Sequence, residues 1–198
     1  MAWQEKISVR GYALTLFPAA LSIIASGSQR LTDLLVYDRQ AILDGELWRL
    51  VTAPLVHFSA SHLFWDVLVF SVAGFAIEAA GFSGFALVCG FAAITPSLLF
   101  LAADPELARW GGLSGLATGA LAYFCLCQAL RTGKSRAVWL GILVVMGVKI
   151  LVELATGTPI FVRAEAQQPF RTLPSVHILG YLAAVIPFFW SRVRNLFT

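Results

Sequence analysis

A serine flanked by glycines marks the segment of this sequence whose residue types could do chemistry. Ser114 lies in Gly112-Leu113-Ser114-Gly115, and Gly119 follows at helical spacing. A serine hydroxyl becomes a nucleophile when a neighbouring base takes its proton, so Ser114 is a candidate catalytic residue. Glycines four residues apart also let helices pack closely in a membrane. On this segment alone, catalysis and helix packing both remain open.

The bases available to such a nucleophile are few, because the chain holds only three histidines. They are His57, His62 and His177, and each precedes or opens a long apolar run. An imidazole titrates near pH 6.5, which suits a general base at neutral pH. Gly180 follows His177 after one helical turn and allows a close approach to the glycines around Ser114. We therefore predict that His177 is the base for Ser114.

Attack of a serine on an amide creates an oxyanion, which requires hydrogen-bond donors already in place. His62 and Asp66 are four residues apart and share one face of a helix. With the backbone N–H of Ser114 and the adjacent Leu113, they are expected to line the oxyanion side of the site.

Composition is typical of a membrane protein with a single compact domain. Of the 198 residues, 59% are hydrophobic and 13% are charged, whereas soluble domains are about half apolar and about a quarter charged. The formal net charge is +3 and the basic residues are spread out, which argues against a nucleic-acid partner. No cluster of histidine, cysteine and carboxylate residues has metal-ligand spacing, so we predict neither a metal nor another cofactor.

Six apolar runs are candidate membrane helices, because a bilayer core takes about 20 apolar residues of helix. The sequence therefore predicts an all-α membrane protein. The long connection at 29–61 is too charged to span, and is expected to form short amphipathic helices at the interface, with Tyr37 and Trp48 at headgroup depth. The predicted spans are 11–28, 62–80, 82–103, 113–130, 137–155 and 176–190.

The density of basic residues predicts the orientation of these spans. Lysines and arginines are densest in the N-terminal segment 1–10, after the fourth span and in the C-terminal segment 191–198. These segments are expected in the cytoplasm, around a membrane domain of residues 11–190. Ser114 and the histidines then lie toward the extracytoplasmic side. The polar loop before the sixth span, with the adjacent helix ends, is the expected gate for substrate and water.

Five short motifs follow one another along the chain. They are Glu46-Leu47-Trp48-Arg49, His57 to His62 followed by Asp66, Gly74-xxx-Glu78, Gly112-Leu113-Ser114-Gly115 with Gly119, and His177-xx-Gly180. Each motif is weak alone, but their order and joint spacing resemble the rhomboid intramembrane serine proteases over almost the whole six-helix region.

The resemblance implies a rhomboid-like six-transmembrane helical bundle that works through a Ser-His dyad without a catalytic acid. It implies Ser114 as nucleophile, His177 as general base and His62 as oxyanion donor. The implied substrates are transmembrane or membrane-anchored proteins, cut in or next to their transmembrane segments, and we expect a bacterial-type inner membrane. The first loop, with Tyr37-Asp38-Arg39 and Glu46, also resembles the rhombosortase branch, whose substrates carry a short C-terminal membrane anchor containing Gly-Gly.

Two positions depart from the family's pattern. Asp66 stands where the family usually has asparagine, and a carboxylate cannot donate a hydrogen bond to an oxyanion. We expect Asp66 either to be protonated through burial or to pair with His62. Val176 and Ala184 replace smaller residues in the sixth span, and Val176 is expected to loosen the approach of the fourth and sixth helices.

The remaining motif residues have expected structural roles. Trp48 and Arg49 are expected to anchor the first loop at the membrane interface. His57 is expected to hydrogen-bond loop backbone. Glu78, which follows Gly74 by one turn near the cytoplasmic end of the second span, is expected to cap or pack a helix.

Two other functions remain open. A catalytically inactive relative that binds transmembrane segments, as a chaperone or trafficking factor, would tolerate Asp66 and Val176. A small transporter would use Lys149, Glu153 and Asp66 as a polar path, but the sequence lacks the internal repeat and paired broken helices of such proteins. Lys149 and Glu153 are four residues apart, which favours an internal ion pair instead.

Overall fold

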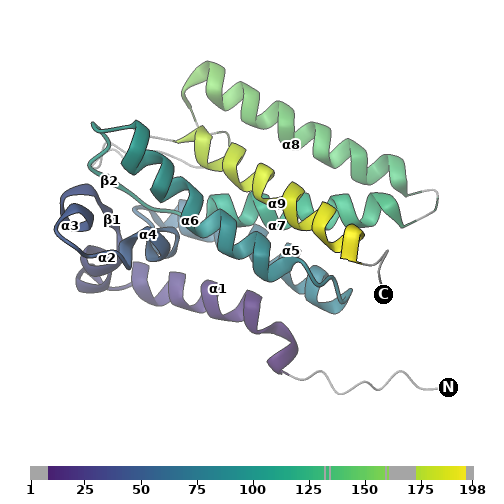
Figure 1. The fold of residues 1–198 in the computed structure, drawn as a ribbon, viewed down its shortest axis with the longest axis horizontal. Helices are drawn as coiled ribbons and strands as arrows, with labels where there is room; N and C mark the ends of the chain where they lie inside the picture. Colours follow the sequence, from purple (N-terminus) through teal and green to yellow (C-terminus); the bar gives the residue numbers. More distant parts are fainter. Residues whose placement is uncertain (1–8, 132, 134, 159, 161–172, 195–198) are drawn as a thin grey trace.

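The computed structural model describes residues 9–131, 133, 135–158, 160 and 173–194, which form a helical bundle with one short strand pairing (Figure 1). Its elements are η1 (Val9–Tyr12), α1 (Ala13–Ser26), α2 (Gln29–Leu35), β1 (Tyr37–Asp38), α3 (Arg39–Leu43), α4 (Arg49–Thr52), η2 (Ala53–Leu55), α5 (Ala60–Ala79), α6 (Phe85–Ala103), β2 (Arg109–Trp110), α7 (Ser114–Leu130), α8 (Arg136–Thr156) and α9 (Pro174–Arg194). Residues 159 and 161–172 of the predicted gate, the loop between the fifth and sixth spans, lie outside the described residues, as do most of the predicted cytoplasmic tails.

A helix lies over each of the six predicted apolar ranges, with ends that local chemistry explains. Helix α5 begins at Ala60 because Ser59 caps it, with Oγ accepting the His62 N–H at 3.1 Å. Helix α9 begins at Pro174, since proline fits the first turn of a helix. Helix α6 begins at Phe85, later than predicted, because the chain turns after α5 through Gly81, whose φ is 70°.

Three helices of the described part, α5, α6 and α8, are long and apolar enough to cross a membrane. Helices α1 and α7 and the stretch Pro174–Phe189 of α9 are also apolar but shorter. Such helices have no favourable place in water, so the chain is an integral membrane protein.

Helix α7 is the central helix, and it packs against α5, α6, α8 and α9. In Figure 1, α8 lies along one edge of the bundle and α1 along the opposite edge. A Cβ added to Gly180 would lie 2.1 Å from the Gly115 carbonyl oxygen, and one added to Gly119 would lie 2.9 Å from the Gly180 carbonyl oxygen. Because no side chain fits at these positions, α7 and α9 meet backbone to backbone.

Val176 does not separate these helices, contrary to the expectation from its size. It is buried, and its Cγ1 occupies the space that the missing side chain of Gly115 leaves. The start of α9 therefore stays close to the start of α7.

Gly74 and Glu78 together hold α1 against α5. A Cβ at Gly74 would lie 2.3 Å from Thr15 Oγ1, so only glycine allows this approach. One turn later, the Glu78 carboxylate accepts hydrogen bonds from the N–H groups of Leu14 and Thr15 and from the Thr15 hydroxyl. The carboxylate thus caps the N-terminus of α1, where free N–H groups and the helix dipole favour a negative charge.

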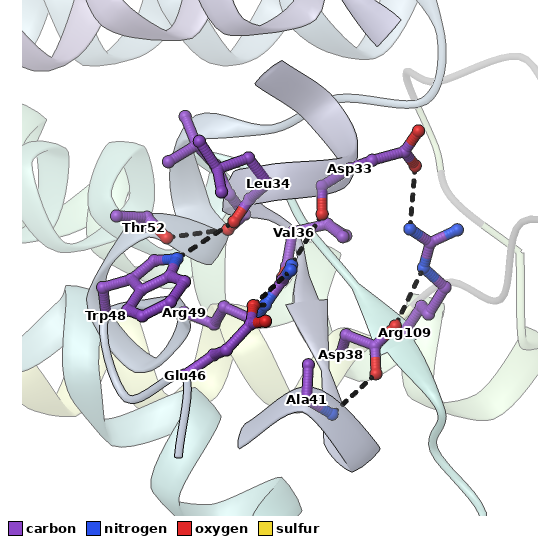
Figure 2. A network of polar contacts seen from close by, with 11 residues as sticks. Asp33, Leu34, Val36, Asp38, Ala41, Glu46, Trp48, Arg49, Thr52 and Arg109 are labelled. Carbon is purple, nitrogen blue, oxygen red and sulfur yellow. Dashed lines mark hydrogen bonds and ion pairs between the residues drawn. The ribbon is translucent and has the colours of Figure 1, made fainter. Parts of the chain in front are cut away.

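Arg49 is only 7% exposed, so its side chain does not anchor the first loop in lipid headgroups as predicted. Its Nη1 donates to the carbonyl oxygens of Asp33 at 2.7 Å and Val36 at 2.9 Å, and its Nε donates to Glu46 at 2.7 Å (Figure 2). These carbonyls stand at the C-terminal end of α2, where no helical N–H remains to bond them. Arg49 therefore closes the end of α2.

Two further carbonyl groups at the C-terminal end of α2 accept hydrogen bonds from side chains close to Arg49 in the sequence. Trp48 Nε1 donates to the Leu34 carbonyl at 3.1 Å, and Thr52 Oγ1 donates to the Leu35 carbonyl at 2.8 Å (Figure 2). The side chain of Trp48 remains exposed, although its ring N–H is bonded to the backbone. The Trp-Arg motif is thus a built-in cap for α2.

Strands β1 and β2 join the first loop to the segment that leads into Ser114. They pair antiparallel, with Tyr37 opposite Trp110 and Asp38 opposite Arg109. Tyr37 is fully buried, with its ring 6.2 Å from that of Trp110, and its expected headgroup depth stays a prediction. Strands of two residues carry no hydrophobic alternation, so the sequence could not predict this pairing.

Candidate active site

Ser114 and all three histidines line one cavity of about 1380 Å³. Its walls come from α5, α7, α8 and α9, and its further polar lining includes Asp66 and Glu153. The beginnings of α5, α7 and α9 thus meet at one end of the bundle, as the topology predicted from the sequence requires.

Ser114 is the first residue of α7 and is half-buried. The preceding Gly112 has a φ of 136°, and a Cβ there would lie 2.7 Å from Cε1 of His62. Glycine is required on both counts, by the backbone conformation and by the closeness of the ring. Backbone N–H groups in the first turn of a helix lack helical partners, so the serine lies at the positive end of α7.

The first polar group beside Ser114, which we call the Asp66 cluster, consists of His57, His62 and Asp66. Oδ2 of Asp66 lies 3.1 Å from Nε2 of His57 and 3.1 Å from Nε2 of His62. All three residues are buried. The carboxylate pairs with His62, which was one of the two expected arrangements, and it lies at the same distance from His57.

His57 connects this cluster to the backbone next to the nucleophile. The Leu113 N–H donates to Nε2 of His57 at 3.1 Å, and Nδ1 lies 3.4 Å from Ser26 Oγ. Burial lowers the pKa of His57, although the nearby Asp66 carboxylate opposes this, and the neutral ring is favoured. A neutral ring with its hydrogen on Nδ1 can accept from Leu113, and it then has no hydrogen for Asp66.

This geometry bears on Leu113, which was expected on the oxyanion side. Its N–H is committed to His57, and its side chain is fully buried. The N–H that follows, on Ser114 itself, is the backbone donor at the N-terminus of α7.

The second polar group, which we call the Glu153 cluster, consists of Lys149, Glu153 and His177. Oε2 of Glu153 lies 2.9 Å from Nζ of Lys149, which is the ion pair expected from their spacing. The same oxygen lies 3.0 Å from Nδ1 of His177, and this contact was not predicted. Glu153 and His177 belong to different helices, and no local pattern in the sequence links them.

Ser114 and His177 line the same cavity without forming a hydrogen-bonded pair. Both line the cavity, and Val176 packs on Gly115, which places the starts of α7 and α9 together. Between these two described residues the structure has no hydrogen bond. Catalytic hydrogen bonds are often long without substrate and tighten in the complex, so this geometry is compatible with a dyad.

The other motif residues lie away from the cavity lining. Trp48 and Arg49 close α2, and Gly74 and Glu78 hold α1. The cavity wall itself is mostly apolar and includes Trp65 and Val69 of α5, Leu121 of α7, and Val145 and Val152 of α8.

One comparison with known proteins bears on this arrangement. The family profile described as the rhomboid domain matches residues 44–187, which is most of the chain. The matched range contains Ser114 and both polar clusters. None of the curated proteins compared with the chain matches it.

Proposed function

The chain belongs to the rhomboid family, and from this premise we propose that it is an intramembrane serine endopeptidase acting on membrane-anchored proteins. The observation that carries the proposal is that Ser114, at the N-terminus of α7, and His177, near the start of α9, line one cavity with apolar walls. A nucleophile and a base at one depth of a membrane bundle are what peptide hydrolysis there requires.

In the proposed reaction, the proton of Ser114 Oγ passes to Nε2 of His177 while Oγ bonds to the scissile carbonyl carbon. The C–N bond then breaks, and the imidazolium gives its proton to the leaving amine. Water attacks the acyl-enzyme and gives one proton to His177. The bond from the acyl carbon to Oγ breaks, and that proton returns to Ser114, so one peptide bond and one water yield an acid and an amine.

The oxyanion of this reaction needs donors near Ser114. The backbone N–H of Ser114 lies at the positive end of α7, where it can donate, and His62 lines the same cavity. Nε2 of His62 lies within 3.1 Å of Asp66, so the carboxylate orients this ring. We therefore keep the Ser114 N–H and His62 as the proposed donors and leave Leu113 out.

Substrate would reach Ser114 from the side of the bundle between α5 and α8. Trp65 and Val69 on α5, and Val145 and Val152 on α8, line the cavity there with apolar side chains. An apolar wall suits a transmembrane segment better than a soluble peptide. Most of the loop predicted as the gate lies outside the described residues, and its role remains a prediction.

We also propose the membrane arrangement that the apolar helices suggest. All six helices α1, α5, α6, α7, α8 and α9 would cross a bacterial-type inner membrane, making residues 11–190 one membrane domain. Both termini would then lie in the cytoplasm and Ser114 toward the extracytoplasmic side. In Figure 1, α1 begins and α9 ends at the end of the bundle opposite the first loop, as termini on one side of the membrane require. Membership of the rhombosortase branch stays a prediction.

Covalent labelling with a fluorophosphonate probe tests the proposal on the purified protein in detergent. We expect the wild type to be labelled, and Ser114→Ala and His177→Ala to lose labelling, because the probe reacts only with an activated serine. Ser97→Ala is the matched control, since Ser97 is a buried serine of α6 away from the cavity lining. Its labelling should match that of the wild type.

A folded wild type that is not labelled, either in detergent or in lipid vesicles, would contradict the proposal. The rival function would then be an inactive relative that binds transmembrane segments. That rival predicts binding of a membrane-anchored peptide which survives Ser114→Ala.

A further inference from the structure

Glu153 is a buried carboxylate that touches the candidate base, and the proposed dyad gives it no role. It lies near the end of α8 and is 2% exposed. Its Oε2 is 3.0 Å from Nδ1 of His177 and 2.9 Å from Nζ of Lys149. Its Oε1 accepts the backbone N–H of Ile160 at 3.0 Å. Both carboxylate oxygens therefore face hydrogen-bond donors.

This set of partners determines which nitrogen of the His177 ring carries the hydrogen. An ionised carboxylate only accepts hydrogen bonds, so a nitrogen that bonds to it must donate. The contact is to Nδ1, and a neutral imidazole carries one hydrogen. With Nδ1 protonated, Nε2 presents a lone pair, which is the atom that can take a proton from a serine.

Lys149 gives the Glu153 carboxylate a positively charged partner even when the ring of His177 is neutral. Its ammonium group lies on the same oxygen and supplies a positive charge to the carboxylate. The side chain of His177 is 17% exposed and lines the cavity, whereas that of Glu153 is 3% exposed. Both side chains line the cavity, and the carboxylate is the more buried of the two.

We infer that Glu153 is a positioning residue, which holds His177 with Nδ1–H toward α8 and leaves Nε2 free to receive the Ser114 proton. The inference rests on the proposed function and deepens it. The site then works as Ser114–His177–Glu153, with an acid supplied by α8. Glu153 stabilises the imidazolium that forms when the serine attacks, as the carboxylate of a catalytic triad does.

A purely structural ion pair between Lys149 and Glu153 is the simpler alternative. Such a pair would stabilise α8 at i, i+4 spacing and would leave the ring of His177 unconstrained. The two interpretations differ in what they predict for the tautomer of His177, which can be measured without substrate.

The first measurement is nitrogen NMR of the detergent-solubilised wild type labelled with ¹⁵N-histidine, with His177 assigned from the spectrum of His177→Gln. We expect neutral His177 to carry its hydrogen on Nδ1, and Glu153→Gln to change this distribution. A glutamine cannot accept at both ends, whereas both oxygens of Glu153 face donors. Neutral His177 with its hydrogen on Nε2 in the wild type would overturn the inference.

The second measurement is the rate of fluorophosphonate labelling of Ser114. We expect Glu153→Gln to slow it by about 100- to 10,000-fold, as loss of a triad carboxylate does, and Glu153→Asp to recover part of the rate. Glu78→Gln is the matched control, because Glu78 is a hydrogen-bonded carboxylate that contacts α1 instead of His177. It should label at the wild-type rate.

The outcomes separate this inference from the proposed function. A Glu153→Gln protein that labels within about threefold of wild type would overturn the inference and leave the protease proposal standing. A wild type without Ser114-dependent labelling would remove the protease proposal, and the His177 tautomer would still decide the role of Glu153. If Glu153→Gln does not fold, the wild-type tautomer decides the matter in the same way.

Discussion

The Asp66 cluster and the Glu153 cluster both line the cavity of Ser114, but they are held in different ways. In the Asp66 cluster, His57 accepts the Leu113 N–H at 3.1 Å, so this cluster is bonded to the backbone next to the nucleophile. In the Glu153 cluster, the carboxylate comes from α8 and the imidazole from α9. The contact between Glu153 and His177 does not involve the segment that carries Ser114.

This difference suggests how the two sides of the reaction centre respond to change. The oxyanion side, which is the Asp66 cluster, should move with the nucleophile, because a hydrogen bond joins His57 to the Leu113 N–H next to Ser114. The base side, which is the Glu153 cluster, is held by the packing of α8 on α7 and of α9 on α6 and α7, and Gly115 and Gly180 touch in the contact of α7 with α9. We therefore expect the base side to be the more sensitive of the two.

The largest effect should come from Gly180→Ala, which separates the base side from Ser114. The new Cβ would collide with the Gly115 carbonyl oxygen. Because the atoms it meets belong to the backbone of α7, the two helices would have to move apart. Overpacking of this kind costs about 1–3 kcal/mol or more, and the displaced His177 should reduce fluorophosphonate labelling below detection. Thermal unfolding and labelling rate are measured together.

The control for this substitution is Gly147→Ala in α8, where an added Cβ meets nothing within 4 Å. It should leave both the unfolding midpoint and the labelling rate near wild-type values. Wild-type labelling in Gly180→Ala would show that the base side does not depend on this helix contact.

A second prediction concerns the carboxylate of the Asp66 cluster. Asp66→Ala removes the acceptor that His62 bonds and the carboxylate that packs against His57, and a buried group left unpaired costs about 1–3 kcal/mol. Asp66→Asn keeps one oxygen and removes a negative charge near the oxyanion. We expect the alanine variant to lose stability and labelling, and the asparagine variant to label at the wild-type rate or faster.

Complete loss of labelling in a folded Asp66→Asn protein would disagree with this account. The ionised carboxylate itself would then be needed, and the two clusters would be more alike than their geometry suggests.

A third prediction follows from the lowered pKa of His57, which burial causes. Between that lowered pKa and the ordinary value of about 6.5, the unfolded chain binds a proton that the folded protein does not. The stability contributed by neutral His57 is therefore complete above about pH 6.5 and falls as the pH is lowered. The midpoint temperature of thermal unfolding should therefore be lower at about pH 5.5 than at about pH 7.5.

The variant His57→Gln isolates this contribution from those of Asp66 and His62, which face the same ring. Its unfolding midpoint should change less over the same pH interval. An equal drop in the variant would assign the pH dependence to other groups.

The smallest effect should come from an ion pair outside both clusters. Arg109 Nη2 lies 2.9 Å from Asp33 Oδ1, and both side chains are about half exposed (Figure 2). The pKa of Asp33 is lowered by hydrogen bonds from Gln29 and then Arg109, so this contribution is present above the ordinary pKa of aspartate and lost in acid. Water and salt screen such a pair strongly.

We expect Arg109→Gln to unfold at nearly the wild-type temperature, with any difference disappearing as the salt concentration rises. A large, salt-independent loss of stability would mean that the pairing of β1 with β2, which these side chains flank, depends on the charges.

Much of the helical framework could be predicted from the sequence, because hydropathy and caps are local. The apolar runs became α1 and α5 to α9, and Ser59 and Pro174 account for two ends that were misplaced. Arg49 could not be placed correctly, since the carbonyls that it bonds belong to a helix end earlier in the chain. An arginine next to a tryptophan is also what an interfacial anchor looks like.

The sequence by itself determined that His62 and Asp66 would meet, and that Lys149 and Glu153 would pair. Residues four apart on a helix are neighbours whatever surrounds them. Only the tertiary structure decided that Glu153 would also reach His177, and that the Leu113 N–H would be taken by His57. Those contacts depend on the rotation and depth of separate helices, which are set by close packing and leave no periodic signal in the chain.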